Sequence, residues 1–186
     1  AGTFNAANIA KNTILEDYPE FDLTIIDSKC ASIGFGLVVS KLVTMLEHGA
    51  AKEELVEAAD YYIAHVHHVF TVHTLAYLIK GGRLTKFKGT LAETLDMKPV
   101  LIVDEKGALS VIKTVRGRKK SLKYLIEYAR ENSQAMEGAT VALCHGEDAE
   151  SRDHMLSMIE EEIHPGEVLI GTVGCAIGAH TGRGLI

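Results

Sequence analysis

Cysteine is scarce in this sequence, and its scarcity sets the first limits on what the protein can be. The 186 residues include three cysteines, Cys30, Cys144 and Cys175. Their number is odd and no two of them form a C-x-x-C pair, so the sequence predicts neither a disulfide framework nor a zinc site. We therefore expect a protein of a reducing compartment, the cytoplasm.

Long apolar runs are also lacking. None reaches the roughly 18 residues that a membrane helix needs, and the first residues do not have the pattern of a signal peptide. We expect no integral membrane contact. The formal net charge is −6 at pH 7, which argues against nucleic acid as a partner.

Apolar periodicity predicts an α/β fold. Helices are expected over 4–18, 33–47, 52–65, 74–80, 88–95, 119–132 and 149–163, and strands over 23–26, 68–73, 99–103, 109–115, 140–144 and 168–173. A single strand, 23–26, cannot complete an open sheet. We therefore interpret 1–66 as the C-terminal part of an incomplete Rossmann-like domain and 67–186 as a second α/β domain with a mixed sheet. We expect residues to be missing on both sides.

Arg83 follows a glycine pair, Gly81-Gly82, at the end of an expected helix. Glycine lets the backbone turn with positive φ, and the arginine that follows offers a fork of donors suited to a carboxylate or a phosphate. A plain helix C-cap followed by a solvated arginine explains the same spacing.

The segment 174–184 holds glycines around a His-Thr pair. We expect a loop of exposed backbone N–H groups that could cradle an anion, with contacts from Gly178, Thr181 and Gly182. His180 could donate a hydrogen bond to a carboxylate or act as an acid or base. A surface turn is the alternative, and the segment does not match a Walker loop.

Basic residues are concentrated between residues 113 and 123. Four of them, Arg116, Arg118, Lys119 and Lys120, suggest a docking patch for an acidic partner or a phosphate, although such runs are usually solvated. Basic charge at a helix start opposes the helix macrodipole, which hints at a role other than helix stability. His65, His67 and His68 could bind a metal, but no further ligand stands at suitable spacing, so we expect no metal site.

Several of these segments together resemble the DegV family of bacterial fatty-acid-binding proteins, in the family's order and over nearly the whole chain. The matching segments are Gly2-Thr3-Phe4, Ile26-Asp27-Ser28 with Ser32-Ile33-Gly34-Phe35-Gly36, Leu78 to Leu84 with Met97-Lys98-Pro99-Val100-Leu101, Val115-Arg116-Gly117, and Ile177-Gly178-Ala179-His180-Thr181-Gly182.

The resemblance implies a two-domain fold that holds a long-chain fatty acid between its domains, without catalysis and without a cofactor. It assigns the carboxylate to Arg83, His180 and the Gly2-Thr3 segment. It also implies a separate fatty-acid kinase as partner, which phosphorylates the bound acid. The sequence has Ala1 where the family has a serine, so one carboxylate hydroxyl is absent.

Two alternatives to a fatty-acid-binding protein remain open on the residues alone. One is a phosphate-handling enzyme that uses the glycine-rich segment and Arg83. The other is a regulatory interaction protein that docks a partner through its basic segment.

Overall fold

Three helices come first along the chain in the computed structural model, which describes residues 2–84, 96–134 and 136–186. They are α1 (Gly2–Asp17), α2 (Ser32–Glu47) and α3 (Lys52–His65). α2 and α3 pack together as a hairpin. Gly49, with φ of +87°, makes the turn between them, where a residue with a side chain would be strained. All three helices fall where the apolar periodicity predicts them.

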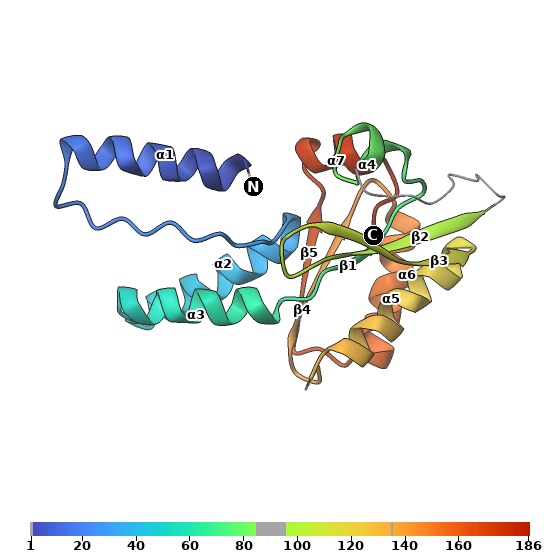
Figure 1. The fold of residues 1–186 in the computed structure, drawn as a ribbon. Helices are drawn as coiled ribbons and strands as arrows, with labels where there is room; N and C mark the ends of the chain where they lie inside the picture. The colour runs from blue at the N-terminus through green and yellow to red at the C-terminus, as the bar shows by residue number, and fades with distance from the viewer. Residues whose placement is uncertain (1, 85–95, 135) are drawn as a thin grey trace.

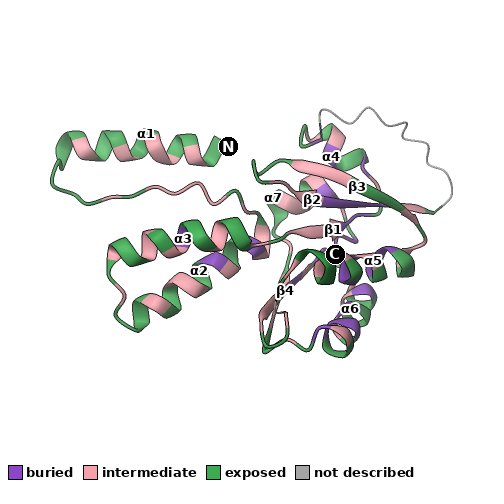
Figure 2. Cartoon of the chain, turned by 60° about the horizontal axis from the view of Figure 1, so that its bottom comes forward, coloured by how far each residue is buried: buried purple, intermediate pink, exposed green. Residues whose placement is uncertain are grey.

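α1 stands apart from the rest of the chain (Figures 1 and 2). It has no buried residue, and an extended segment, residues 18–31, connects it to α2. The predicted strand over 23–26 is wrong, because none of the described strands pairs with this segment to accept and donate its backbone hydrogen bonds. Lys52 of α3 forms an ion pair with Asp22 in the same segment.

The described strands form two sheets rather than the single mixed sheet that we expected. β1 (Val69–Thr71), β2 (Met97–Val103) and β3 (Leu109–Arg116) form an antiparallel sheet in that order, whereas β4 (Thr140–His145) and β5 (Glu167–Thr172) pair in parallel. The α/β class is confirmed. Both kinds of pairing are present because β2 and β3 are joined by a tight turn, while β4 and β5 are joined through a helix.

The other helices are α4 (Ala76–Lys80), α5 (Arg118–Asn132), α6 (Ala149–Glu162) and α7 (Cys175–Thr181). The first three agree with the predicted helices. The predicted helix over 88–95 lies outside the described residues. None of the described helices combines the length and the apolar character needed to cross a bilayer.

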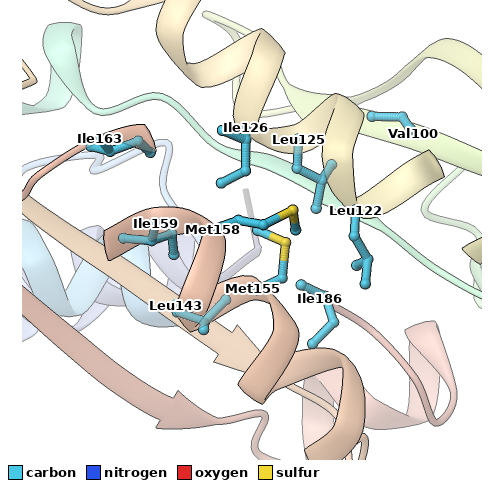
Figure 3. Packing of buried hydrophobic residues seen from close by; sticks show 10 residues of the cluster. All are labelled: Val100, Leu122, Leu125, Ile126, Leu143, Met155, Met158, Ile159, Ile163 and Ile186. Carbon is cyan, nitrogen blue, oxygen red and sulfur yellow. The ribbon is translucent and has the colours of Figure 1, made fainter. Parts of the chain in front are cut away.

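The core lies where α5 and α6 pack together (Figure 3). Its most deeply buried members on α5 are Leu122, Leu125 and Ile126, and α6 contributes Met155, Met158 and Ile159 from the facing side. Burial of such a side chain contributes about 1.5–3 kcal/mol. A second buried cluster includes Leu78 of α4 and Leu101 of β2.

The last three residues join the two sheets. Ile186 exchanges two backbone hydrogen bonds with Thr71 of β1, at 2.7 and 3.1 Å. Gly146, directly after β4, donates to Leu185 O at 2.9 Å and accepts from Gly184 N at 2.7 Å. Leu185 is buried in the cluster around Leu78, and Ile186 in the cluster around α5 and α6. The segment that follows α7 is therefore fixed on both sides.

His68 fastens the start of α2 to the segment that precedes β1. Its ring lies against Gly34, where an added Cβ would overlap it, and its Nε2 accepts a hydrogen bond from Ala31 N at 3.4 Å. Burial lowers the pKa of His68 from its ordinary value, and hydrogen bonds to Ala31 and Val66 oppose that shift only in part. The neutral ring is thus the form that fits this position. The predicted domain boundary near residue 66 falls beside it and remains a prediction.

The sign of the pH dependence follows from that lowered pKa. The unfolded chain binds a proton at position 68 more readily than the native chain, so acid favours unfolding. We expect the free energy of unfolding to fall as the pH drops below about 6.5, the ordinary histidine value. It should level off below the pKa of the native state.

Urea unfolding at pH 7.5 and at lower pH would measure this loss. His68→Gln should reduce the dependence strongly, whereas His67→Gln, at an exposed neighbouring position, should change it little, because the charge of His67 is the smallest of the effects on the pKa of His68. The role assigned to His68 is wrong if His68→Gln shows the same pH dependence as the parent chain.

Candidate functional site

Arg83 and His180, nearly a hundred residues apart in sequence, both contact Gly81. Arg83 is exposed, and its Nη1 donates to Gly81 O at 2.8 Å. The ring of His180 lies so close to Gly81 that an added Cβ would overlap its Nδ1. The structure therefore brings these two predicted residues to one place, at the contact between α4 and α7.

Two glycines make this contact possible. Gly81 ends α4 and receives the ring of His180, while Gly182 ends α7 and receives the ring of Tyr77. A Cβ at Gly182 would stand 2.8 Å from Cδ2 of Tyr77. Its φ of +72° also favours glycine. Each helix thus offers a bare backbone to an aromatic ring of the other.

His180 has a nitrogen with no partner among the described residues. Nδ1 is buried and makes no hydrogen bond, although the side chain as a whole is only half-buried. A buried ring nitrogen without a partner costs free energy. Because this same atom is the ring atom nearest Gly81, a ligand group reaches it only if the ring turns.

The expected glycine-rich loop is wrong, because residues 175–181 form α7. Gly178 N donates to Gly174 O at 2.9 Å and Gly182 N donates to Gly178 O at 2.8 Å, so these N–H groups are used within the helix. Thr181 is buried and its hydroxyl donates to Ile177 O at 3.1 Å. The sequence between the flanking glycines contains residues that tolerate a helix, and Gly174 and Gly182 serve as its caps. The alternative function as a phosphate-handling enzyme therefore lacks the anion-binding loop on which it depended.

Gly2 and Thr3 form the exposed start of α1. Figures 1 and 2 both draw this end of α1 pointing toward the part of the chain that contains α7. α1 is not among the element pairs that pack extensively. The role of Gly2 and Thr3 at the carboxylate therefore stays a prediction.

The four basic residues of the expected docking patch differ in their surroundings. Arg116, Lys119 and Lys120 are exposed. Arg118 is instead held in a network, donating to Asp148 Oδ2 at 2.8 Å, Gly184 O at 2.7 Å and Ser151 Oγ at 3.1 Å. Hydrogen bonds from Ser151 and Arg118 outweigh the effect of burial and lower the pKa of Asp148. Arg118 thus has a structural role that its position in a basic run did not indicate.

Sequence reasoning missed the contacts of His68 and His73. The ring of His73 lies against Gly184, as that of His68 lies against Gly34. Spacing along the chain carries no signal for either, because each pairs a histidine with a glycine far away in sequence. Among the described residues, the three-histidine segment is not part of a group of three or more side chains placed to hold a metal ion.

The chain is similar to known proteins along its whole length. The family model described as an uncharacterised protein of the DegV family matches residues 1–186. The chain belongs to the DegV family. A DegV domain-containing protein of Clostridium perfringens is 32% identical over 186 residues, which is 100% of this chain and 64% of that protein. The chain thus spans less than two thirds of the length of this DegV relative.

Solved DegV structures share the fold. One from Ruminococcus gnavus, refined with vaccenic acid, has a TM-score of 0.92 at 25% identity. The match covers 100% of this chain and 66% of the Ruminococcus gnavus chain. The Fatty Acid Kinase (Fak) B3 protein of Streptococcus pneumoniae, loaded with linoleic acid, has a TM-score of 0.90 at 27% identity. The match covers 100% of this chain and 65% of the Streptococcus pneumoniae chain. The resemblance read from the motifs is confirmed at the level of family and fold.

Gly81→Ala tests the contact that brings His180 to Arg83. The new methyl group must displace the His180 ring, and overpacking of this kind costs about 1–3 kcal/mol. We expect a lower midpoint of thermal unfolding and a changed NMR environment of the His180 ring.

Gly174→Ala is the matched control, because a Cβ there meets no atom within 4 Å and the backbone φ is −68°. An unshifted His180 signal in Gly81→Ala would contradict the placement of the ring.

Proposed function

We propose that this DegV chain binds a long-chain fatty acid, with the carboxylate held by Arg83 and His180. The observation that carries the proposal is the approach of both side chains to Gly81. DegV neighbours solved with vaccenic or linoleic acid support the class of ligand.

The head group fits the chemistry of these two residues. A carboxylate buried without partners costs several kcal/mol, so it needs donors. Arg83 supplies a charge-assisted fork, and the imidazole of His180 can donate a further hydrogen bond. The hydroxyl of Thr3 is proposed as a third donor, from the start of α1. Gly178, Thr181 and Gly182 contribute by shaping α7, not by binding the acid.

The tail would lie on apolar surface that the first three helices leave open. On α2, Phe35 is 51% exposed and Leu46 is 58% exposed, and Ile9 on α1 is 68% exposed. A small cavity of about 150 Å³ between α2 and α3 is lined by apolar residues that include Leu37 and Tyr62. We propose these exposed apolar residues as the surface that the tail would cover.

The energetics allow tight binding. Each buried methylene contributes about 0.8 kcal/mol, so some fifteen of them supply roughly 12 kcal/mol. Association costs take back on the order of 4–15 kcal/mol. Affinity would come from the tail, and orientation from the head group.

We propose binding and presentation rather than catalysis. The hydroxyl of Thr181, the nearest such group to His180 along α7, is engaged with the backbone, and no nucleophile hydrogen-bonded to a base stands around Gly81 in the described part of the chain. We further propose that a separate fatty-acid kinase acts on the bound carboxylate. The name of the Streptococcus pneumoniae neighbour supports this partner. We place the function in the cytoplasm, where free thiols remain reduced.

Lipid extraction tests the acyl proposal. Protein purified from bacteria should carry a stoichiometric long-chain acid, identified by mass spectrometry. Arg83→Gln and His180→Gln should each weaken uptake of added oleate by about tenfold, because each removes a hydrogen bond to a charged group.

Arg130→Gln, on the exposed end of α5, should bind oleate as the parent does. Empty protein that takes up no added acid would overturn the proposal.

Kinase docking has its own test. Arg116 and Lys120 are exposed, and charge reversal at both should slow association with an acidic partner surface. We expect Arg116→Glu with Lys120→Glu to lower the rate of acyl phosphate formation by a purified fatty-acid kinase while oleate binding stays unchanged. An unaltered rate would place the docking surface elsewhere.

A further inference from the structure

α7, the helix that carries His180, depends on its neighbours for its orientation. It has seven residues, of which Thr181 alone is buried, and a helix this short has little stability of its own. Among the elements of the described chain that pack extensively, α7 pairs with α4 alone (Figure 1). The contact with α4, together with the bonds of the segment after α7, therefore sets which way the imidazole faces.

The two ring nitrogens of His180 are not equivalent in this contact. Nδ1 is the ring atom nearest Gly81 and is buried without a partner among the described residues. Nε2 is thus the nitrogen that can donate to a carboxylate without a turn of the ring. A small rotation of α7 would move this donor relative to Arg83, so the orientation of the helix decides whether both side chains reach one head group.

Tyr77 of α4 contacts both of the glycines at this junction. Its ring lies against Gly182, two residues after His180, where a Cβ would stand 2.8 Å from both Cδ2 and Cε2. Its backbone oxygen accepts a hydrogen bond from Gly81 N at 2.8 Å. Tyr77 thus holds both the glycine beneath the imidazole and the end of the helix that carries it.

Tyr77 differs from Leu78, the next residue of α4, in its burial. Tyr77 is 50% exposed, whereas Leu78 is 1% exposed and belongs to the buried cluster that includes Leu101. The backbone oxygen of Leu78 also accepts a hydrogen bond from Arg83 N at 2.9 Å. Leu78 thus anchors both α4 and the start of the Arg83 segment, so removal of the Tyr77 ring should leave them in place.

We propose that Tyr77 is a positioning residue, which holds the imidazole of His180 toward the acyl carboxylate through its contact with Gly182. This role rests on the proposed function, because it requires that His180 binds the head group. Tyr77 acts through His180 and does not touch the acid itself. The atoms of Tyr77 nearest Gly182 are ring carbons, so the ring and not the hydroxyl group carries the role.

NMR of the chain without added ligand tests the positioning by itself. The parent should show a nuclear Overhauser contact between Hε1 of His180 and the α-protons of Gly81, because Cε1 lies beside this glycine. Tyr77→Ala should weaken that contact, since α7 can turn once the ring over Gly182 is gone. Tyr77→Phe keeps the ring and should retain the contact. Tyr128→Ala is the matched control, because it removes a half-buried tyrosine ring from α5.

A double-mutant cycle on oleate affinity tests the route through His180. Tyr77→Ala should weaken oleate binding by about three- to tenfold, no more than the loss expected for His180→Gln. In the His180→Gln background the same change should cause no further loss, whereas in the Arg83→Gln background it should still weaken binding. Tyr77→Phe should bind oleate as the parent does.

Two results would overturn the role of Tyr77. One is an Overhauser contact between His180 and Gly81 that Tyr77→Ala leaves unchanged. The other is a loss of oleate binding in Tyr77→Ala that keeps its full size in the His180→Gln background, because that loss would indicate a direct contact with the acid or a general loss of structure.

Failure of the proposed function would look different. A parent chain that takes up no oleate, or a His180→Gln variant that binds it as the parent does, would contradict the assignment of the head group to His180. The Overhauser contact in the chain without ligand would still show whether the Tyr77 ring sets the orientation of the imidazole.

Discussion

The fold depends on the backbone hydrogen bonds that the segment after α7 makes on both of its sides. Through Leu185 and Ile186 it joins the loop after β4 to β1, and thus one sheet to the other. Packing of α5 on the first sheet and on α6, which lies on β4, is a further link between the two sheets. Because His180 stands six residues before Ile186, the same bonds fix the position of the imidazole relative to α4.

Glycine decides how closely the parts of the site approach. His180, Tyr77, His73 and His68 each lie against a glycine of another segment. Close packing of a ring on a bare backbone gives a contact that tolerates no larger residue. The geometry of the site is therefore set by the absence of side chains as much as by their presence.

Much of the fold was predictable from apolar spacing, because α5 and α6 bury one face in the core and α2 and α3 have the same helical spacing of apolar residues. The segment 23–26 misled, since three apolar residues and a threonine carry no information about whether a strand lies beside them. α7 was missed because its flanking glycines suggest a loop, although they act as caps. Arg83 and His180 were found through motif resemblance, and their shared neighbour Gly81 only through the structure. The network of Arg118 was hidden within a basic run.

The contact between Gly81 and His180 has a consequence for how related sequences can diverge. Any side chain at position 81 would need the space that the imidazole fills, so a change there is tolerated only together with a smaller residue at position 180. The same holds for positions 182 and 77. These two pairs should therefore vary jointly among sequences that keep this fold, and a homologue with alanine at position 81 and histidine at position 180 must space α4 and α7 further apart.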